Sequence, residues 1–83
     1  MYEQLKTILI TDLHVAEGDV RPEATREEAG LDSLAMVELS MAIGKRLGLD
    51  VSDDELLEAA TVGDLARLVE ERAAQAAQEA SSP

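Results

Sequence analysis

The sequence predicts an all-α fold, a small four-helix bundle with three longer helices and one short third helix. Two observations predict it. Apolar residues recur at helical spacing in three segments, and capping residues and glycines mark the ends of these segments. No segment alternates polar and apolar residues in the manner of a strand, so we expect no sheet.

The first helix is predicted over residues 3–15, followed by Gly18 and Pro22 as helix-ending residues. Its apolar positions are Leu5, Ile8, Leu9 and Leu13. Residues 16–30 show no strong apolar period and are expected to form a long loop across the surface.

The second helix is predicted from Ser33 to Leu47, with Asp32 or Ser33 as its N-cap and Gly48 just beyond its end. The segment "SDDELLEA" at 52–59 begins with a serine cap followed by acids. It predicts a short third helix of about two turns.

The fourth helix begins with the cap Thr61, and Gly63 is expected to weaken it slightly. Its apolar face consists of Val62, Leu65, Leu68 and Val69. We expect residues 1–74 to form one domain. Residues 75–83 contain no large apolar residue, so we predict that they form a disordered C-terminal tail.

Composition narrows the classes of function. The chain has no cysteine and a single histidine, His14, so we expect no disulfide and no metal site. No apolar run is long enough to span a membrane and the N-terminus lacks signal-peptide character, so we expect a cytoplasmic protein. Met1 and the polar "SSP" end favour a free-standing protein, which we expect to be a monomer. A net charge of −11 would repel nucleic acid and anionic membranes and would suit partners with basic patches.

The second helix carries two apolar stripes on nearly opposite sides. Met36, Leu39, Ile43 and Leu47 form a core stripe. Leu34, Val37 and Met41 form the second stripe, which a small bundle cannot readily bury as well. Three explanations are open: loops cover the stripe, a few exposed apolar residues have no function, or the stripe is a protein-docking strip with Glu38 at its edge.

Ser33 has three possible roles: helix cap, catalytic nucleophile or attachment point. A nucleophile needs a base and an oxyanion site, and His14, at the end of another helix, is the only histidine. We therefore reject a self-contained hydrolase. An exposed hydroxyl at a helix start is accessible to a modifying enzyme, and a phosphate there meets free N–H groups. The sequence leaves the cap and the attachment point open.

The chain resembles the acyl carrier proteins of fatty acid and polyketide synthesis over residues 3 to about 72. The resemblance rests on "GLDSLAMVEL" at 30–39, on "SMAIGKRLGLDV" after it, and on "TVGDLARLV", which begins 28 residues after Ser33. Ala29 and the polar "TREE" before it depart from the family pattern, which often has large apolar residues there. They predict a more mobile first loop.

The resemblance implies a carrier domain over 1–74, which is not an enzyme but the substrate of a phosphopantetheinyl transferase. Its cofactor would be 4′-phosphopantetheine, attached to Ser33 from coenzyme A with the assistance of Asp32. The arm would carry acyl groups as thioesters. Contacts to the transferase, ketosynthase, acyltransferase and other synthase partners would come from Leu34, Val37, Glu38 and Met41. The interior that shelters acyl chains would be lined by Leu39, Ile43, Leu56 and Leu65.

Several alternatives remain within and outside this family. The form "GLDSL", with Leu31, is more similar to polyketide carriers than to fatty acid carriers. A peptidyl or aminoacyl carrier usually has glycine at that position. Outside the family, the chain would be a helical protein-interaction module in which Ser33 is only a cap.

Overall fold

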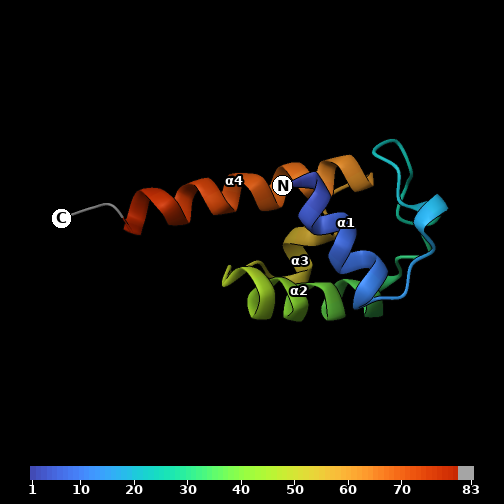
Figure 1. The fold of residues 1–83 in the computed structure, drawn as a ribbon, viewed down its shortest axis with the longest axis horizontal. Coiled ribbons are helices and arrows are strands. Elements are labelled where there is room, and N and C mark those ends of the chain that lie inside the picture. The colour runs from blue at the N-terminus through green and yellow to red at the C-terminus, as the bar shows by residue number, and fades with distance from the viewer. Residues whose placement is uncertain (81–83) are drawn as a thin grey trace.

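The computed structural model describes the backbone of residues 1–80 and the side chains of residues 1–77. Its elements are α1 (Tyr2–Thr11), the 3₁₀ turn η1 (Glu17–Asp19), α2 (Ser33–Leu47), α3 (Asp53–Leu56) and α4 (Val62–Ala80). α1 packs against both α2 and α4, and α3 packs against α2 (Figure 1). The predicted small helical bundle with one short member is confirmed. Within these 80 residues the only strand-like feature is an isolated bridge between Thr25 and Thr61.

All four helices contribute aliphatic side chains to one core. The fully buried large residues are Leu5, Leu9, Met36, Leu39, Ile43, Val51, Leu56, Val62, Leu65 and Val69. No polar or charged side chain is buried among the described residues. The hydrophobic effect is therefore the main force that assembles the helices, and polar contacts act at the rim.

α1 is shorter than the predicted helix over 3–15. His14 adopts a left-handed conformation with a φ of 59°, so the helix cannot continue through it. Histidine is among the non-glycine residues that tolerate this conformation. The N–H of Val15 then donates to the carbonyl of Leu9, which directs the chain into the long loop.

α3 is one turn long instead of the predicted two. Ser52 and Glu55 form the expected capping box, which fixes the start of the helix. Its end comes early because Glu58 and Ala59 donate to carbonyls three residues back, and this tighter 3₁₀ pattern closes the helix.

α4 continues to Ala80, where we predicted a tail. Residues 73–80 are all Ala, Gln or Glu, which favour a helix without tertiary support. Ala73 and Ala76 also pack against the edge of the core. The structure gives residues 75–80 as part of α4, and residues 81–83 lie outside the described part. The domain boundary at residue 74 and the disordered tail stay predictions. In the described part of the chain no helix is long and apolar enough to cross a membrane.

Polar contacts anchor the first loop in place of the missing large apolar residues. The side-chain oxygens of Thr25 and Glu28 each accept a hydrogen bond from the backbone N–H of the other residue. Arg26 Nε donates to the carbonyl of Ala59 at 2.9 Å, across 33 positions of sequence. Small side chains complete the anchor, because Ala24 and Ala29 are both buried.

This loop approaches α4 closely at Gly63. The Gly63 N–H donates to the carbonyl of Pro22 at 2.9 Å. A Cβ at this position would lie 2.9 Å from the same oxygen, so only glycine fits. Gly63, which looked like a weak point of the helix, is what allows the loop to dock.

We expect Gly63→Ala to destabilise the protein by about 1–3 kcal/mol, because the added methyl group must push the loop away from α4. Helix propensity alone predicts the opposite sign, a gain of roughly 0.5–1 kcal/mol. Gly44→Ala is the matched control, since its Cβ would lie 3.6 Å from the nearest oxygen, that of Leu49. Urea unfolding of both variants checks the prediction; a Gly63→Ala protein as stable as Gly44→Ala would contradict it.

Candidate functional site

Asp32 caps the N-terminus of α2. Its backbone is extended, with a φ of −82° and a ψ of −177°, and its Oδ1 accepts the N–H of Ala35 at 2.8 Å. The sequence left the cap open between Asp32 and Ser33. The structure assigns it to Asp32, so Ser33 is the first helical residue and is not needed as a cap.

Ser33 presents its hydroxyl to solvent. It is an exposed residue, and no hydrogen bond to its hydroxyl is found among the described side chains. The hydroxyls of the other two serines in residues 1–80 are occupied: Ser40 donates to the carbonyl of Val51, and Ser52 caps α3. Ser33 therefore has the one serine hydroxyl in residues 1–77 that is free of hydrogen bonds.

The segment before Ser33 is held firmly. Gly30 adopts a left-handed conformation with a φ of 73°, and the next N–H, that of Leu31, donates to the carbonyl of Arg26 at 2.7 Å. The side chain of Leu31 is buried. This turn fixes the approach of the chain to α2 and places Asp32 and Ser33 at the surface.

A phosphodiester on Ser33 fits this environment. The first N–H groups of a helix have no intrahelical partner, and here those of Ser33 and Leu34 have no backbone acceptor among the described residues. They and the positive end of the helix dipole favour an anion at this position. Among the described side chains no base is hydrogen-bonded to the Ser33 hydroxyl, whereas a serine nucleophile needs such a base.

The outer stripe of α2 is uncovered. Leu34, Val37 and Met41 are 67%, 40% and 70% exposed, and Glu38 beside them is also exposed. The opposite stripe is buried through Met36, Leu39 and Ile43, while Leu47 is only partly buried. The two-stripe prediction is confirmed, and no loop of the described chain shields the outer one.

The four residues predicted to line an acyl cavity lie within the core. Leu39, Ile43, Leu56 and Leu65 have no exposed surface and belong to one apolar cluster. Their side chains come from α2, α3 and α4. The family resemblance implied that they line the interior, and their role as a cargo site stays a prediction.

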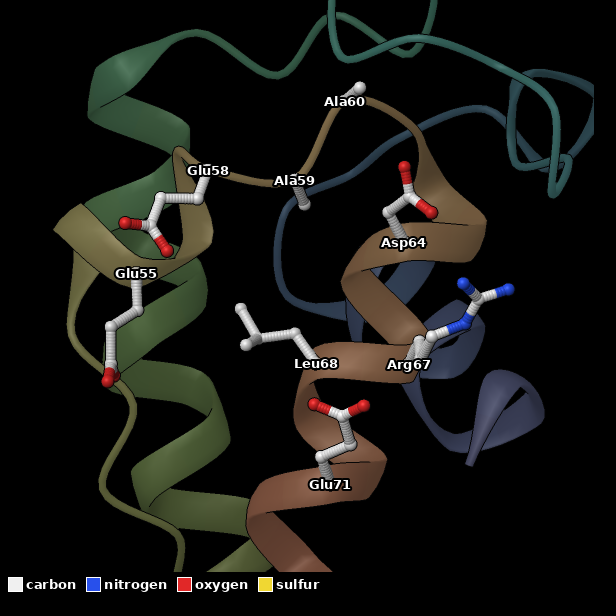
Figure 2. A pocket seen from close by; sticks show the side chains of 8 residues that line it. All are labelled: Glu55, Glu58, Ala59, Ala60, Asp64, Arg67, Leu68 and Glu71. Atoms are coloured by element: carbon white, nitrogen blue, oxygen red, sulfur yellow. The ribbon is translucent and has the colours of Figure 1, made fainter.

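A surface hollow lies between α3 and α4, with Leu68 pointing toward α3 (Figure 2). It is lined by Glu55, Glu58, Ala59, Ala60, Asp64, Arg67, Leu68 and Glu71. Four of these side chains are carboxylates and one is a cation. None of the four buried residues of the predicted cavity lines this hollow, which contributes acidic surface.

Arginines make long-range contacts that the sequence analysis missed. Arg72 of α4 binds the Glu55 carboxylate at 2.5 Å and donates to the carbonyl of Asp50, which holds α3 and the preceding loop to α4. Arg46 of α2 binds both carboxylate oxygens of Asp12, just beyond the end of α1. No local pattern signals pairs separated by 17 and 34 positions.

The Arg72 hydrogen bond, with that from the Ser52 backbone, lowers the pKa of Glu55. A carboxyl group whose pKa is lower in the folded than in the unfolded state stabilises the fold at any pH above its unfolded-state pKa, about 4.3 for Glu. This stabilisation is lost as the pH falls through the folded-state pKa. We therefore expect Glu55→Gln to be less stable than the native protein at pH 7, with the difference shrinking below about pH 4.

Glu58→Gln is the control for that measurement, because Glu58 is exposed and lies on the same short segment. Urea unfolding of both variants and the native chain between pH 3 and pH 7 gives the comparison. A Glu55→Gln deficit that stays constant over this range would contradict the assignment.

Comparison with known proteins decides the family. Residues 3–69 match the family model described as "Phosphopantetheine attachment site". The chain is an acyl carrier protein family member. It is 34% identical over 71 residues to the acyl carrier protein of Wolinella succinogenes, covering 84% of this chain and 93% of the relative. Identity to the acyl carrier protein of Helicobacter pylori is 31% over 72 residues, covering 86% and 92%.

Membership of the acyl carrier protein family establishes the general role. The protein is a carrier and not an enzyme, and its prosthetic group is covalently attached 4′-phosphopantetheine. It works with synthase enzymes, since carriers of this family present bound groups to them. The exposed hydroxyl at the start of α2 provides a position that suits the group.

Proposed function

We propose that Ser33 is the attachment site and that the protein carries acyl or polyketide intermediates as thioesters. One observation carries the proposal: Asp32 caps α2, so the exposed Ser33 hydroxyl is available for modification at the positive end of the helix. When bound, the arm supplies the terminal thiol on which thioesters form, and the chain itself contains no cysteine.

The partners would be a phosphopantetheinyl transferase and then ketosynthase, acyltransferase and other synthase enzymes. Asp32 would assist the transferase, because it is exposed and directly precedes the modified serine. Leu34, Val37 and Met41 would make the apolar contacts and Glu38 an ionic one, since all four lie uncovered on α2. The net charge of −11 favours partners with basic surfaces.

Loading with coenzyme A tests the attachment site. The apo-protein is incubated with Mg²⁺, coenzyme A and a broad-specificity phosphopantetheinyl transferase, and its intact mass is recorded before and after. We expect a gain of one phosphopantetheine, located by fragmentation on the peptide that contains Ser33. No gain, or a gain on another serine such as Ser40 or Ser52, would contradict the proposal.

For the pathway we propose polyketide synthesis. The support is the "GLDSL" form of the motif, in which Leu31 is similar to polyketide carriers, and Leu31 is buried. A fatty acid carrier is the second candidate, because the relatives carry only the general name acyl carrier protein. A peptidyl carrier is disfavoured by the same Leu31.

Cargo identification separates these candidates. The protein is purified from its native host under conditions that preserve thioesters, and the group on the arm is identified by mass spectrometry. Malonyl, β-keto or partly reduced polyketide groups would support a polyketide carrier. A series of saturated acyl groups would indicate fatty acid synthesis, and an aminoacyl group a peptidyl carrier.

A further inference from the structure

The outer face of α2 changes the sign of its charge along its length. Asp32 and Glu38 lie toward the Ser33 end, whereas Lys45 and Arg46 lie in the last turn. At about 100° per residue, Lys45 projects within the same arc as Leu34 and Met41. Met41 and Lys45 also line the same surface hollow. Lys45 is therefore part of the outer strip, at the end distant from Ser33.

Lys45 provides the positive charge at this end. Arg46 forms an ion pair with Asp12, whose carboxylate accepts hydrogen bonds from Arg46 Nε at 2.5 Å and Arg46 Nη2 at 2.7 Å. Lys45 is exposed and forms no ion pair among the described residues. Its charge is thus available to a partner that covers the strip.

The two ends of the strip act separately. Seven residues of helix between Glu38 and Lys45 correspond to about 10 Å. That distance exceeds the Debye length at physiological salt, about 8 Å, so the two exposed charges are largely screened from each other. A partner in contact with α2 meets a negative group near Ser33 and a positive group farther along.

We infer that α2 docks onto a synthase surface with a cation opposite Glu38 and a carboxylate opposite Lys45. This inference rests on the proposed function and specifies the partner. A uniformly basic surface would place like charges together at Lys45, which is unfavourable. A surface of two signs also fixes the direction of the helix, so that Ser33 and its arm face the active site.

The test uses holo-protein loaded with a pantetheine analogue that ends in a thiol-reactive group, and a panel of fatty acid and polyketide ketosynthases. Initial crosslinking rates are measured for the native chain, Lys45→Glu and Lys45→Met. Arg67→Glu is the matched control, because it changes the net charge equally on the exposed surface of α4.

With the ketosynthase that reacts fastest with the native chain, we expect Lys45→Glu to react about tenfold more slowly and Lys45→Met about threefold more slowly. Arg67→Glu should stay within about twofold of the native rate. With the same ketosynthase, a Lys45→Glu rate within about twofold of the native rate, or above it, would overturn the inference alone. Failure of the transferase to load the native chain, read by intact mass, would overturn the proposed function and the inference with it.

Discussion

Ser33→Ala is expected to abolish loading with phosphopantetheine completely while changing the free energy of unfolding by less than about 0.5 kcal/mol. The loss is total because no other hydroxyl replaces the attachment point. Stability is retained because Asp32, and not Ser33, accepts the N–H of Ala35. Intact mass after incubation with the transferase measures the first effect, and urea unfolding measures the second.

Asp32 provides the opposite control. Asp32→Ala removes the cap and should cost about 1 kcal/mol, whereas Asp32→Asn keeps a capping oxygen and should cost little. If Asp32 assists the transferase through its charge, Asp32→Asn lowers the loading rate without lowering stability. A Ser33→Ala protein that still gains the mass, or that loses as much stability as Asp32→Ala, would contradict the assignment of roles at the start of α2.

Leu65→Ala is expected to destabilise the protein by about 2–5 kcal/mol, since it removes buried methyl groups and leaves a cavity. Leu65 has no exposed surface and belongs to the central cluster with Leu39, Ile43 and Leu56. This cost is a large part of the free energy of unfolding of a typical domain, which is roughly 5–15 kcal/mol. Leu68→Ala on the same helix is the control; it should cost about 1 kcal/mol, because Leu68 is only partly buried.

The same pair of variants tests the proposed acyl cavity. If an acyl chain enters the core beside Leu65, loading the arm with an octanoyl group should raise the thermal midpoint of Leu65→Ala more than that of the native protein, because the chain fills the new space. Leu68→Ala should gain no more than the native protein. Equal gains in all three proteins would place the chain outside the core and contradict the cargo role of the four buried residues.

Much of the fold was predictable because it depends on local periodicity. α2 begins and ends at the predicted residues, where Asp32, Gly48 and the basic last turn give strong signals. The spacing of Leu34, Val37 and Met41 predicted a second stripe that a bundle of this size cannot readily bury. The structure shows that these three side chains are exposed.

The ends of the other helices were less predictable. α1 ends early at a left-handed His14, although Leu13 continues the apolar spacing. α4 continues past the last large apolar residue, since helix propensity sustains it where packing does not. Helix termini depend on backbone geometry and on weak local preferences, which the apolar pattern does not record.

By itself the sequence determined the helical class, the aliphatic core, the family motif around Ser33 and the acidic character of the surface. The tertiary structure alone decided that Asp32 is the cap, that Gly63 admits the loop at Pro22, and that Arg72 holds α3 to α4. The physical reason is range. Periodicity and capping preferences act within a few residues, and they left Asp32 and Ser33 as equivalent caps. The contacts of Gly63 and Arg72 join residues that are far apart in sequence, so they depend on the folded arrangement of the chain.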